Sequence, residues 1–87
     1  MKINKKQQQL IDEMLRKIKE RYPEVIFKKL IPSADNPEDI WVNVLADMDE
    51  EREMELSFYS AGLSMDILME TDYDILLLID NPSRVYA

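Results

Sequence analysis

The chain has 87 residues, of which 46% are hydrophobic and 33% charged, and its formal net charge is −7. This length corresponds to one small domain with a core of modest size. The absence of cysteine excludes disulfides and thiolate zinc sites, and the absence of histidine removes the commonest general base and metal ligand.

The first predicted element is a helix that starts at Asn4. Asn4 and Gln7 have the spacing of a capping box, in which each side chain bonds the backbone amide of the other residue. The apolar residues that follow recur at helical spacing and form one stripe, namely Leu10, Ile11, Met14, Leu15 and Ile18. Pro23 ends the helix because proline has no amide donor and restricts the residue before it.

Two strands are predicted next. Residues 25–31 are β-branched and aromatic at their start, and residues 40–45 alternate between two faces. The loop between them, residues 32–38, contains two prolines together with Ser, Asp and Asn. Because this loop is short, we expect the two strands to be antiparallel neighbours.

A second helix is predicted from Asp47, which has capping-box spacing with Glu50. Two apolar stripes run along it, one formed by Met54, Phe58, Ala61, Met65 and Leu68 and the other by Leu56, Tyr59, Leu63 and Ile67. This apolar surface is broader than one sheet face requires. Gly62 lies within it and indicates either a close helix approach or a bend, because glycine costs about 1 kcal/mol relative to alanine in a helix.

The third strand is predicted over residues 73–80. It is apolar on both faces, which predicts that it is covered from two sides. The path from the second strand through the helix to this strand is a parallel crossover. The predicted fold class is therefore α/β (α+β), in the order helix-strand-strand-helix-strand, with a three-stranded mixed sheet packed by two helices. Residues 1–87 form one domain, with its core at about residues 4–80 and a tail at residues 81–87.

Three residues at the predicted strand ends carry a resemblance: Ser33 in the loop, Asp39 before the second strand and Asp74 in the third. In this element order they resemble the minimal nucleotidyltransferase domains of the DNA polymerase beta superfamily. Many of those domains are antitoxin-like partners of small helical proteins. The resemblance covers most of the chain, residues 8–80, as a pattern more than as identity.

The family pattern is Gly-Ser after the first strand, Asp-x-Asp at the second strand and a further carboxylate on the third. In this chain Pro32-Ser33 stands where Gly-Ser would be, and Asp39 and Asp74 match the first and third carboxylates. Trp41 stands where the second carboxylate would be. The resemblance implies a two-metal phosphoryl site, in which carboxylates two apart on a strand bridge both ions.

An indole cannot ligate magnesium, so we expect a non-catalytic, nucleotidyltransferase-like protein-interaction module, antitoxin-like and without a cofactor. The alternative is a minimal nucleotidyltransferase that uses Asp39 and Asp74 with Mg²⁺ and a nucleoside triphosphate and is completed by a partner subunit. Each residue also has an ordinary interpretation: Asp39 as a strand end, Asp74 as a solvated flank and Ser33 as a turn residue.

The predicted binding surface comprises Trp41, Phe58, Tyr59 and Gly62. Trp41 is either an anchor for a partner or a cover for the core. The methionines on or beside the second helix suit an adaptable binding groove, with core filling as the alternative: Met48, Met54, Met65 and Met69. The expected partner is a second copy of the chain or a small helical protein.

The two parts of the chain carry opposite net charge, which indicates which classes of partner to expect. Residues 1–31 carry nine basic and four acidic residues, a net +5, and residues 32–87 carry two basic and fourteen acidic residues, a net −12. The acidic part would repel a phosphate backbone, so nucleic acid is not an expected partner. The longest uncharged apolar run, residues 75–79, is too short to span a membrane, and we expect a cytoplasmic protein.

Overall fold

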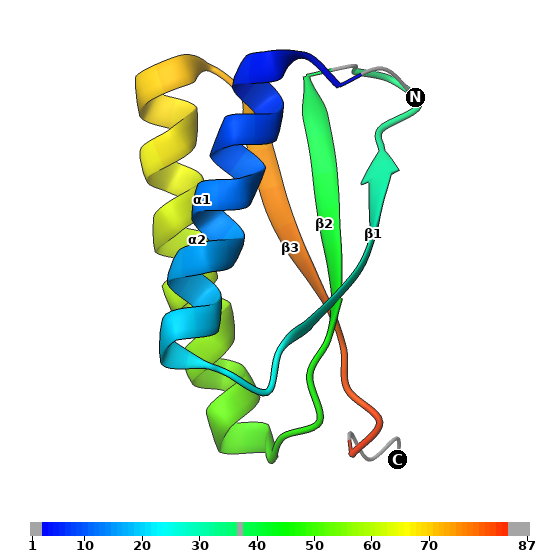
Figure 1. Ribbon diagram of the computed structural model, residues 1–87, viewed down its shortest axis with the longest axis vertical. Coiled ribbons are helices and arrows are strands. Elements are labelled where there is room, and N and C mark those ends of the chain that lie inside the picture. The colour runs from blue at the N-terminus through cyan, green and yellow to red at the C-terminus, as the bar shows by residue number, and fades with distance from the viewer. Residues whose placement is uncertain (1–2, 37, 84–87) are drawn as a thin grey trace.

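The computed structural model describes residues 3–36 and 38–83. The elements are α1 (Lys5–Arg21), β1 (Ile26–Pro32), β2 (Asp39–Leu45), α2 (Glu50–Thr71) and β3 (Asp74–Asp80). The sheet order is β1-β2-β3, with β1 antiparallel and β3 parallel to β2. The predicted fold class is confirmed: a small α+β domain with two helices and a three-stranded mixed sheet (Figure 1).

Helix α1 begins as the sequence predicts. The Asn4 side-chain oxygen accepts a hydrogen bond from the Gln7 amide at 2.7 Å, and the Gln7 side chain accepts one from the Asn4 amide at 3.1 Å. The helix ends at Tyr22, whose amide bonds the Ile18 carbonyl at 2.8 Å. The capping box therefore defines the N-terminal end of α1 through local hydrogen bonds.

Helix α2 begins later than predicted. Its N-cap is Asp49, whose carboxylate accepts a hydrogen bond from the Arg52 amide at 2.8 Å, and Asp47 instead bonds the Ser83 hydroxyl. Met48 explains the difference, because its side chain is buried and its backbone is bonded by the side chain of Asn81 at both the amide and the carbonyl. These tertiary bonds hold Met48 outside the helix.

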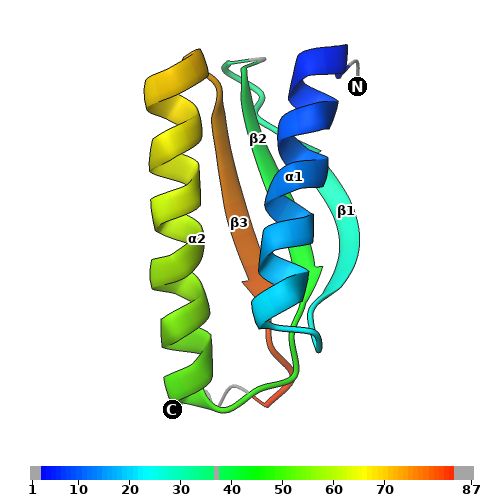
Figure 2. The same ribbon diagram turned by 60° about the vertical axis from the view of Figure 1, so that its left-hand side comes forward.

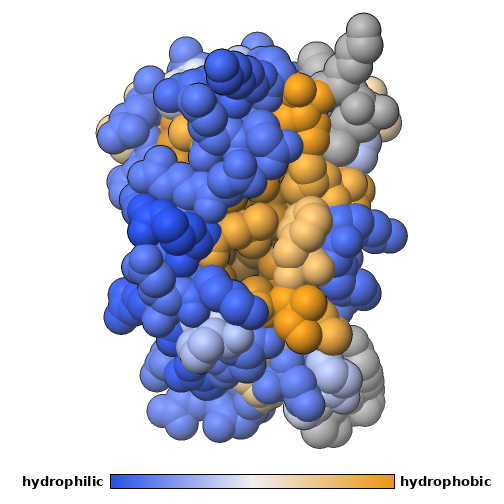
Figure 3. Space-filling view, viewed as in Figure 1, coloured by the Kyte–Doolittle hydropathy of each residue, from blue (hydrophilic) through white to orange (hydrophobic). Residues whose placement is uncertain are grey.

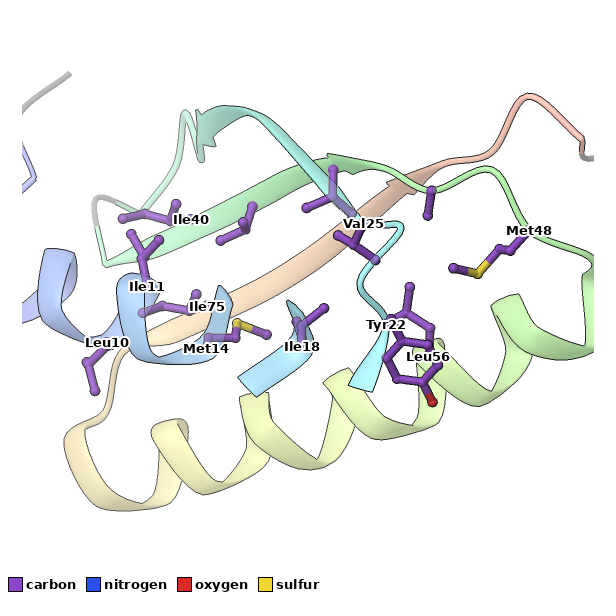
Figure 4. Close-up of a cluster of buried hydrophobic side chains, with 13 residues drawn as sticks. Leu10, Ile11, Met14, Ile18, Tyr22, Val25, Ile40, Met48, Leu56 and Ile75 are labelled. Atoms are coloured by element: carbon purple, nitrogen blue, oxygen red, sulfur yellow. The ribbon is translucent and has the colours of Figure 1, made fainter. Parts of the chain in front are cut away.

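Both helices cover the same face of the sheet, and they run in opposite directions (Figures 1 and 2). One core lies between the helices and the sheet (Figure 4). Helix α1 contributes Ile11, Met14 and Ile18 to it, and β2 contributes Val42 and Val44. Each of these side chains is at most 1% exposed. Alternate residues of β2 therefore face the helices, and the residues between them lie on the opposite face.

Strand β3 is not covered from two sides, so that prediction is wrong. It forms an edge of the sheet, and of its residues only Ile75 is fully buried, whereas Leu78 is 39% exposed. The two helices cover one sheet face only, and Leu78 lies on the other. The apolar run at residues 75–79 thus places part of its hydrophobic surface against solvent.

The predicted tail at residues 81–87 begins too early. Asn81 is only 7% exposed, and its side-chain amide also donates to the Glu53 carboxylate at 2.8 Å. Asn81 therefore joins the end of β3 to the start of α2 and belongs to the folded domain. Residues 84–87 of that prediction lie outside the described residues.

Candidate functional site

The predicted strand-end carboxylates lie side by side. Asp39 on β2 and Asp74 on β3 are direct partners in the parallel ladder, and both side chains are partly exposed. Neighbouring strands in a sheet are about 4.8 Å apart, so these two residues meet on one face. The Ser33 amide donates to the Asp39 carbonyl at 3.1 Å. The structure thus brings the three predicted residues to one end of the sheet.

The Ser33 side chain serves its own loop. Its hydroxyl accepts hydrogen bonds from the amides of Asp35 and Asn36 at 3.3 and 3.4 Å. This is the geometry of a turn residue, as the ordinary interpretation of Ser33 requires. The hydroxyl oxygen is engaged by the loop, and the backbone amide of Ser33 is engaged by β2.

Trp41 lies on the sheet face that the helices leave uncovered. It is 39% exposed and is flanked in register by Ile31 on β1 and Leu76 on β3, so the three side chains form an apolar row across the sheet. Trp41 is not part of the core between the helices and the sheet. The indole stands two residues along β2 from Asp39 and on the same face.

The carboxylate pair has limited capacity for a metal. Among residues 3–36 and 38–83, no group of three or more His, Cys, Asp or Glu side chains is placed to hold an ion. Magnesium prefers an octahedral shell of oxygen atoms, of which Asp39 and Asp74 would supply only part. Two like charges in register on adjacent strands also oppose each other.

The outward face of α2 is apolar. We define the α2 stripe as Met54, Phe58, Met65 and Met69, residues spaced by four, seven and four positions and therefore on one side of the helix. Phe58 is 74% exposed, Met69 78%, and Met54 and Met65 55% each. Leu56, on the opposite side, is fully buried. The interpretation of these methionines as core filling is thus wrong for three of the four, and it holds for Met48.

Tyr59 and Gly62, the other predicted surface residues on α2, differ from the stripe. Tyr59 is half-buried at the seam with α1, where the Arg21 guanidinium lies 4.5 Å from its ring centroid and Tyr22 packs beside it. Gly62 is exposed, and a Cβ added there would meet no atom within 4 Å. A close helix approach therefore does not explain the glycine.

Acidic side chains border the α2 stripe. Glu51, Glu55, Asp66 and Glu70 are exposed on α2, and none takes part in an ion pair among the described residues. The single cation of α2, Arg52, is committed to Glu24, which its Nη2 contacts at 3.1 Å. This hydrogen bond lowers the pKa of the Glu24 carboxyl and raises the pKa of the Arg52 guanidinium. The stripe therefore has a negative border.

A shallow groove lies between Trp41 and one flank of α2. It runs along the free edge of β3, has a volume of about 150 Å³, and is bordered by Trp41 and Leu76 on the sheet and by Ser57, Ala61 and Ser64 on the helix. Small side chains on this flank of α2 leave the β3 edge accessible. Trp41 and this flank of α2 thus line the same groove.

A second apolar surface lies between α1 and β1. Figure 3 shows it as a hollowed hydrophobic band, and Leu15, Ile26 and Phe27 line it together with charged residues of both signs on α1. Ile26 is 55% exposed and Phe27 47%. Because both acidic and basic side chains border this surface, its charge does not indicate whether a bound partner would be cationic or anionic.

No family model, no curated protein and no solved structure matches this chain. No helix within the described ranges combines the length and the apolarity needed to cross a membrane. The geometry of the described residues therefore provides the evidence on function.

Sequence reasoning missed two features of this region: the Glu24–Arg52 pair and the unpaired acidic border. The pair joins residues 28 positions apart, and no local pattern marks it. The border was detectable, because every charged residue of α2 except Arg52 is acidic. The composition of the two apolar stripes also carried a signal: the buried stripe contains Leu and Ile, and the exposed stripe is rich in Met.

Proposed function

We propose that this chain is a non-catalytic, nucleotidyltransferase-like module that binds another protein through the α2 stripe and the Trp41 side of the sheet. One observation carries the proposal: four large apolar side chains on the outward face of one helix are each more than half exposed. The outward face of a helix in an isolated domain is normally polar, and clustered exposed apolar side chains mark interaction sites. The proposed role is antitoxin-like, in the cytoplasm.

The nucleotidyltransferase part of the proposal has structural support from one end of the sheet. The Ser33 amide donates a hydrogen bond to the Asp39 carbonyl there, and Asp39 pairs in register with Asp74. Trp41 occupies the same sheet face where a second metal-bridging carboxylate would stand. A site without this bridging carboxylate lacks a ligand that two-metal catalysis needs, which favours binding over catalysis.

Site-specific photo-crosslinking in cells that express the protein tests the interaction. A photoreactive phenylalanine analogue at Phe58 is expected to give one discrete adduct with a second chain, because Phe58 is at the centre of the stripe. The same analogue at Gln9, exposed on α1, is the matched control and is expected to give none. Absence of an adduct at position 58, or equal adducts at both positions, would contradict the proposal.

A second candidate function is supported by the register of Asp39 and Asp74. Two carboxylates on adjacent strands can share one Mg²⁺, which a partner subunit would complete into a site for a nucleoside triphosphate. Calorimetric titration with Mg²⁺ and ATP separates the two functions. We expect no binding heat. Clear heat that Asp39→Asn abolishes, and that Asp35→Asn in the nearby loop leaves intact, would establish the enzyme instead.

A further inference from the structure

The geometry points to a specific class of partner: we propose that the α2 stripe binds a cationic amphipathic helix of another protein. This inference rests on the proposed function and adds the chemistry of the partner. It depends on the charge around the stripe, on the side chains within it and on the groove beside it.

Charge selects a cationic partner. The stripe is bordered by Glu51, Glu55, Asp66 and Glu70, which have no ion-pair partner among the described residues. Arg52, the only basic residue of α2, is held by Glu24 and the Arg21 carbonyl. Lysine or arginine side chains on an approaching chain would find these carboxylates available, and such complementary charge favours both encounter and orientation.

The side chains of the stripe suit a helical partner. Met54, Phe58, Met65 and Met69 form a line along 16 residues of helix, which is long enough to contact the i, i+3, i+4 and i+7 anchors of an amphipathic helix. Three of the four are methionine, whose unbranched and polarizable side chain adjusts to partners of different shape. The groove of about 150 Å³ between Ala61 and Trp41 lies beside this line.

The same charges disfavour a second copy of the chain as the occupant. A symmetric pair of α2 stripes would bring the acidic border of one copy against that of the other, with no basic side chain of α2 free to compensate. The basic residues of the chain are concentrated on α1, whose exposed face is polar. A cationic helix from a different protein avoids this repulsion.

The test uses fluorescence anisotropy of labelled 18-residue peptides with the whole chain. The main probe has leucine on one helical face and lysine on the other, one control replaces lysine by glutamate, and another scrambles the order of the leucines and lysines. Binding of the leucine–lysine helix alone is expected, with affinity that falls as salt is added. Equal binding of the glutamate peptide or of the scrambled peptide would overturn the inference.

Two sets of variants locate the binding surface. The double substitution Phe58→Ser with Met65→Ser is expected to weaken binding at least about tenfold, as loss of central apolar anchors does. Its matched control is Phe27→Ser, which removes an exposed aromatic residue from a different face. If the double variant binds as tightly as the unmodified chain, or the control weakens binding equally, the inference is wrong.

Neutralising part of the acidic border tests the charge argument. Glu55→Gln, Asp66→Asn and Glu70→Gln together are expected to reduce affinity several-fold, roughly threefold to thirtyfold for three exposed charge contacts. The control Asp12→Asn, Asp35→Asn and Glu38→Gln changes the net charge equally at other exposed sites and should have little effect. Equal losses in the two sets would show attraction to net charge alone and would contradict the inference.

The results distinguish a failure of this inference from a failure of the proposed function. An adduct at position 58 in cells, combined with no binding of the leucine–lysine helix, would contradict the cationic helix as the partner. The proposed function as a protein-interaction module would still stand. Self-association that depends on Phe58 and Met65, measured by sedimentation, would instead assign the stripe to a second copy and overturn the inference.

Discussion

Gly62 is the residue with the simplest predicted effect. It lies in the middle of α2, is exposed, and has no atom within 4 Å of the position of an added Cβ. Gly62→Ala is therefore expected to raise the free energy of unfolding by about 0.5–1 kcal/mol, because alanine loses less backbone entropy in a helix. Urea denaturation measures the change, with Ala61→Gly as the reverse control. A destabilised Gly62→Ala variant would show that the space is occupied.

Glu24 is expected to make stability depend on pH. The hydrogen bond from Arg52 lowers the pKa of its carboxyl in the folded state, so the pair stabilises the fold above the unfolded pKa, which is about 4.3. That contribution is lost as the pH falls through the lower folded pKa. Glu24→Gln should cost up to about 1 kcal/mol at pH 7, because the pair is partly exposed.

The difference between the unmodified chain and Glu24→Gln should shrink as the pH falls toward about 3, and urea denaturation at several pH values measures it. Glu20→Gln is the control, because the Arg16–Glu20 pair is more exposed. A difference for Glu24→Gln that is unchanged or larger at low pH would contradict this interpretation of the ion pair.

Asn81 connects the last described residues to the core. Asn81→Ala leaves the buried amide and carbonyl of Met48 without their partner, which is expected to cost about 1–3 kcal/mol of stability. Ser83→Ala, two residues later and exposed, should change stability by no more than about 0.5 kcal/mol. Thermal or urea unfolding of both variants checks this contrast. Equal, small effects would restore the interpretation of residues 81–83 as a tail.

At the scale of elements, the orientation of α2 is testable with two neighbouring residues. Leu56 is fully buried and Phe58 is 74% exposed. Leu56→Ala is expected to cost about 2–5 kcal/mol, and Phe58→Ala about 0.5 kcal/mol or less. The comparison is made by urea unfolding, and similar losses in both variants would mean that the stripe is part of the core.

The order and direction of the elements followed from local signals. The capping box at Asn4 and the prolines before β1 and at its end act over a few residues, and apolar residues at helical spacing mark the helix between β2 and β3, so sequence patterns captured them. The start of α2 was predicted too early because Asn81, more than thirty positions away, bonds Met48 and holds it outside the helix.

The sequence did not predict the exposure of β3 or the position of the Trp41 side chain, for a related reason. An apolar strand is predicted to be covered on both faces, but coverage depends on which face each helix packs against. Both helices cover one face here (Figure 2). Trp41 and Leu78, each 39% exposed, lie on the other face. A strand pattern contains no information on where a distant helix packs.

At the scale of the whole molecule, the basic N-terminal part and the acidic remainder have distinct roles in this account. Helix α1 places its apolar stripe in the core and its charges in solvent, while α2 has an apolar face on both sides and acidic residues between them. The sequence already contained both stripes of α2, and the structure assigns one to the core and the other to the surface. The resemblance to nucleotidyltransferases stays a prediction, and it depends on Asp39, Trp41 and Asp74.

The most direct test of the central claim is a photo-crosslinking scan along both helices in cells that express the protein. With the probe placed in turn at Met54, Phe58, Met65 and Met69, adduct yield is expected to be high. At the exposed α1 positions Gln9 and Glu20, it is expected to be near background. A profile that is flat along α2, or that is highest on α1, would contradict the assignment of the α2 stripe as the binding surface.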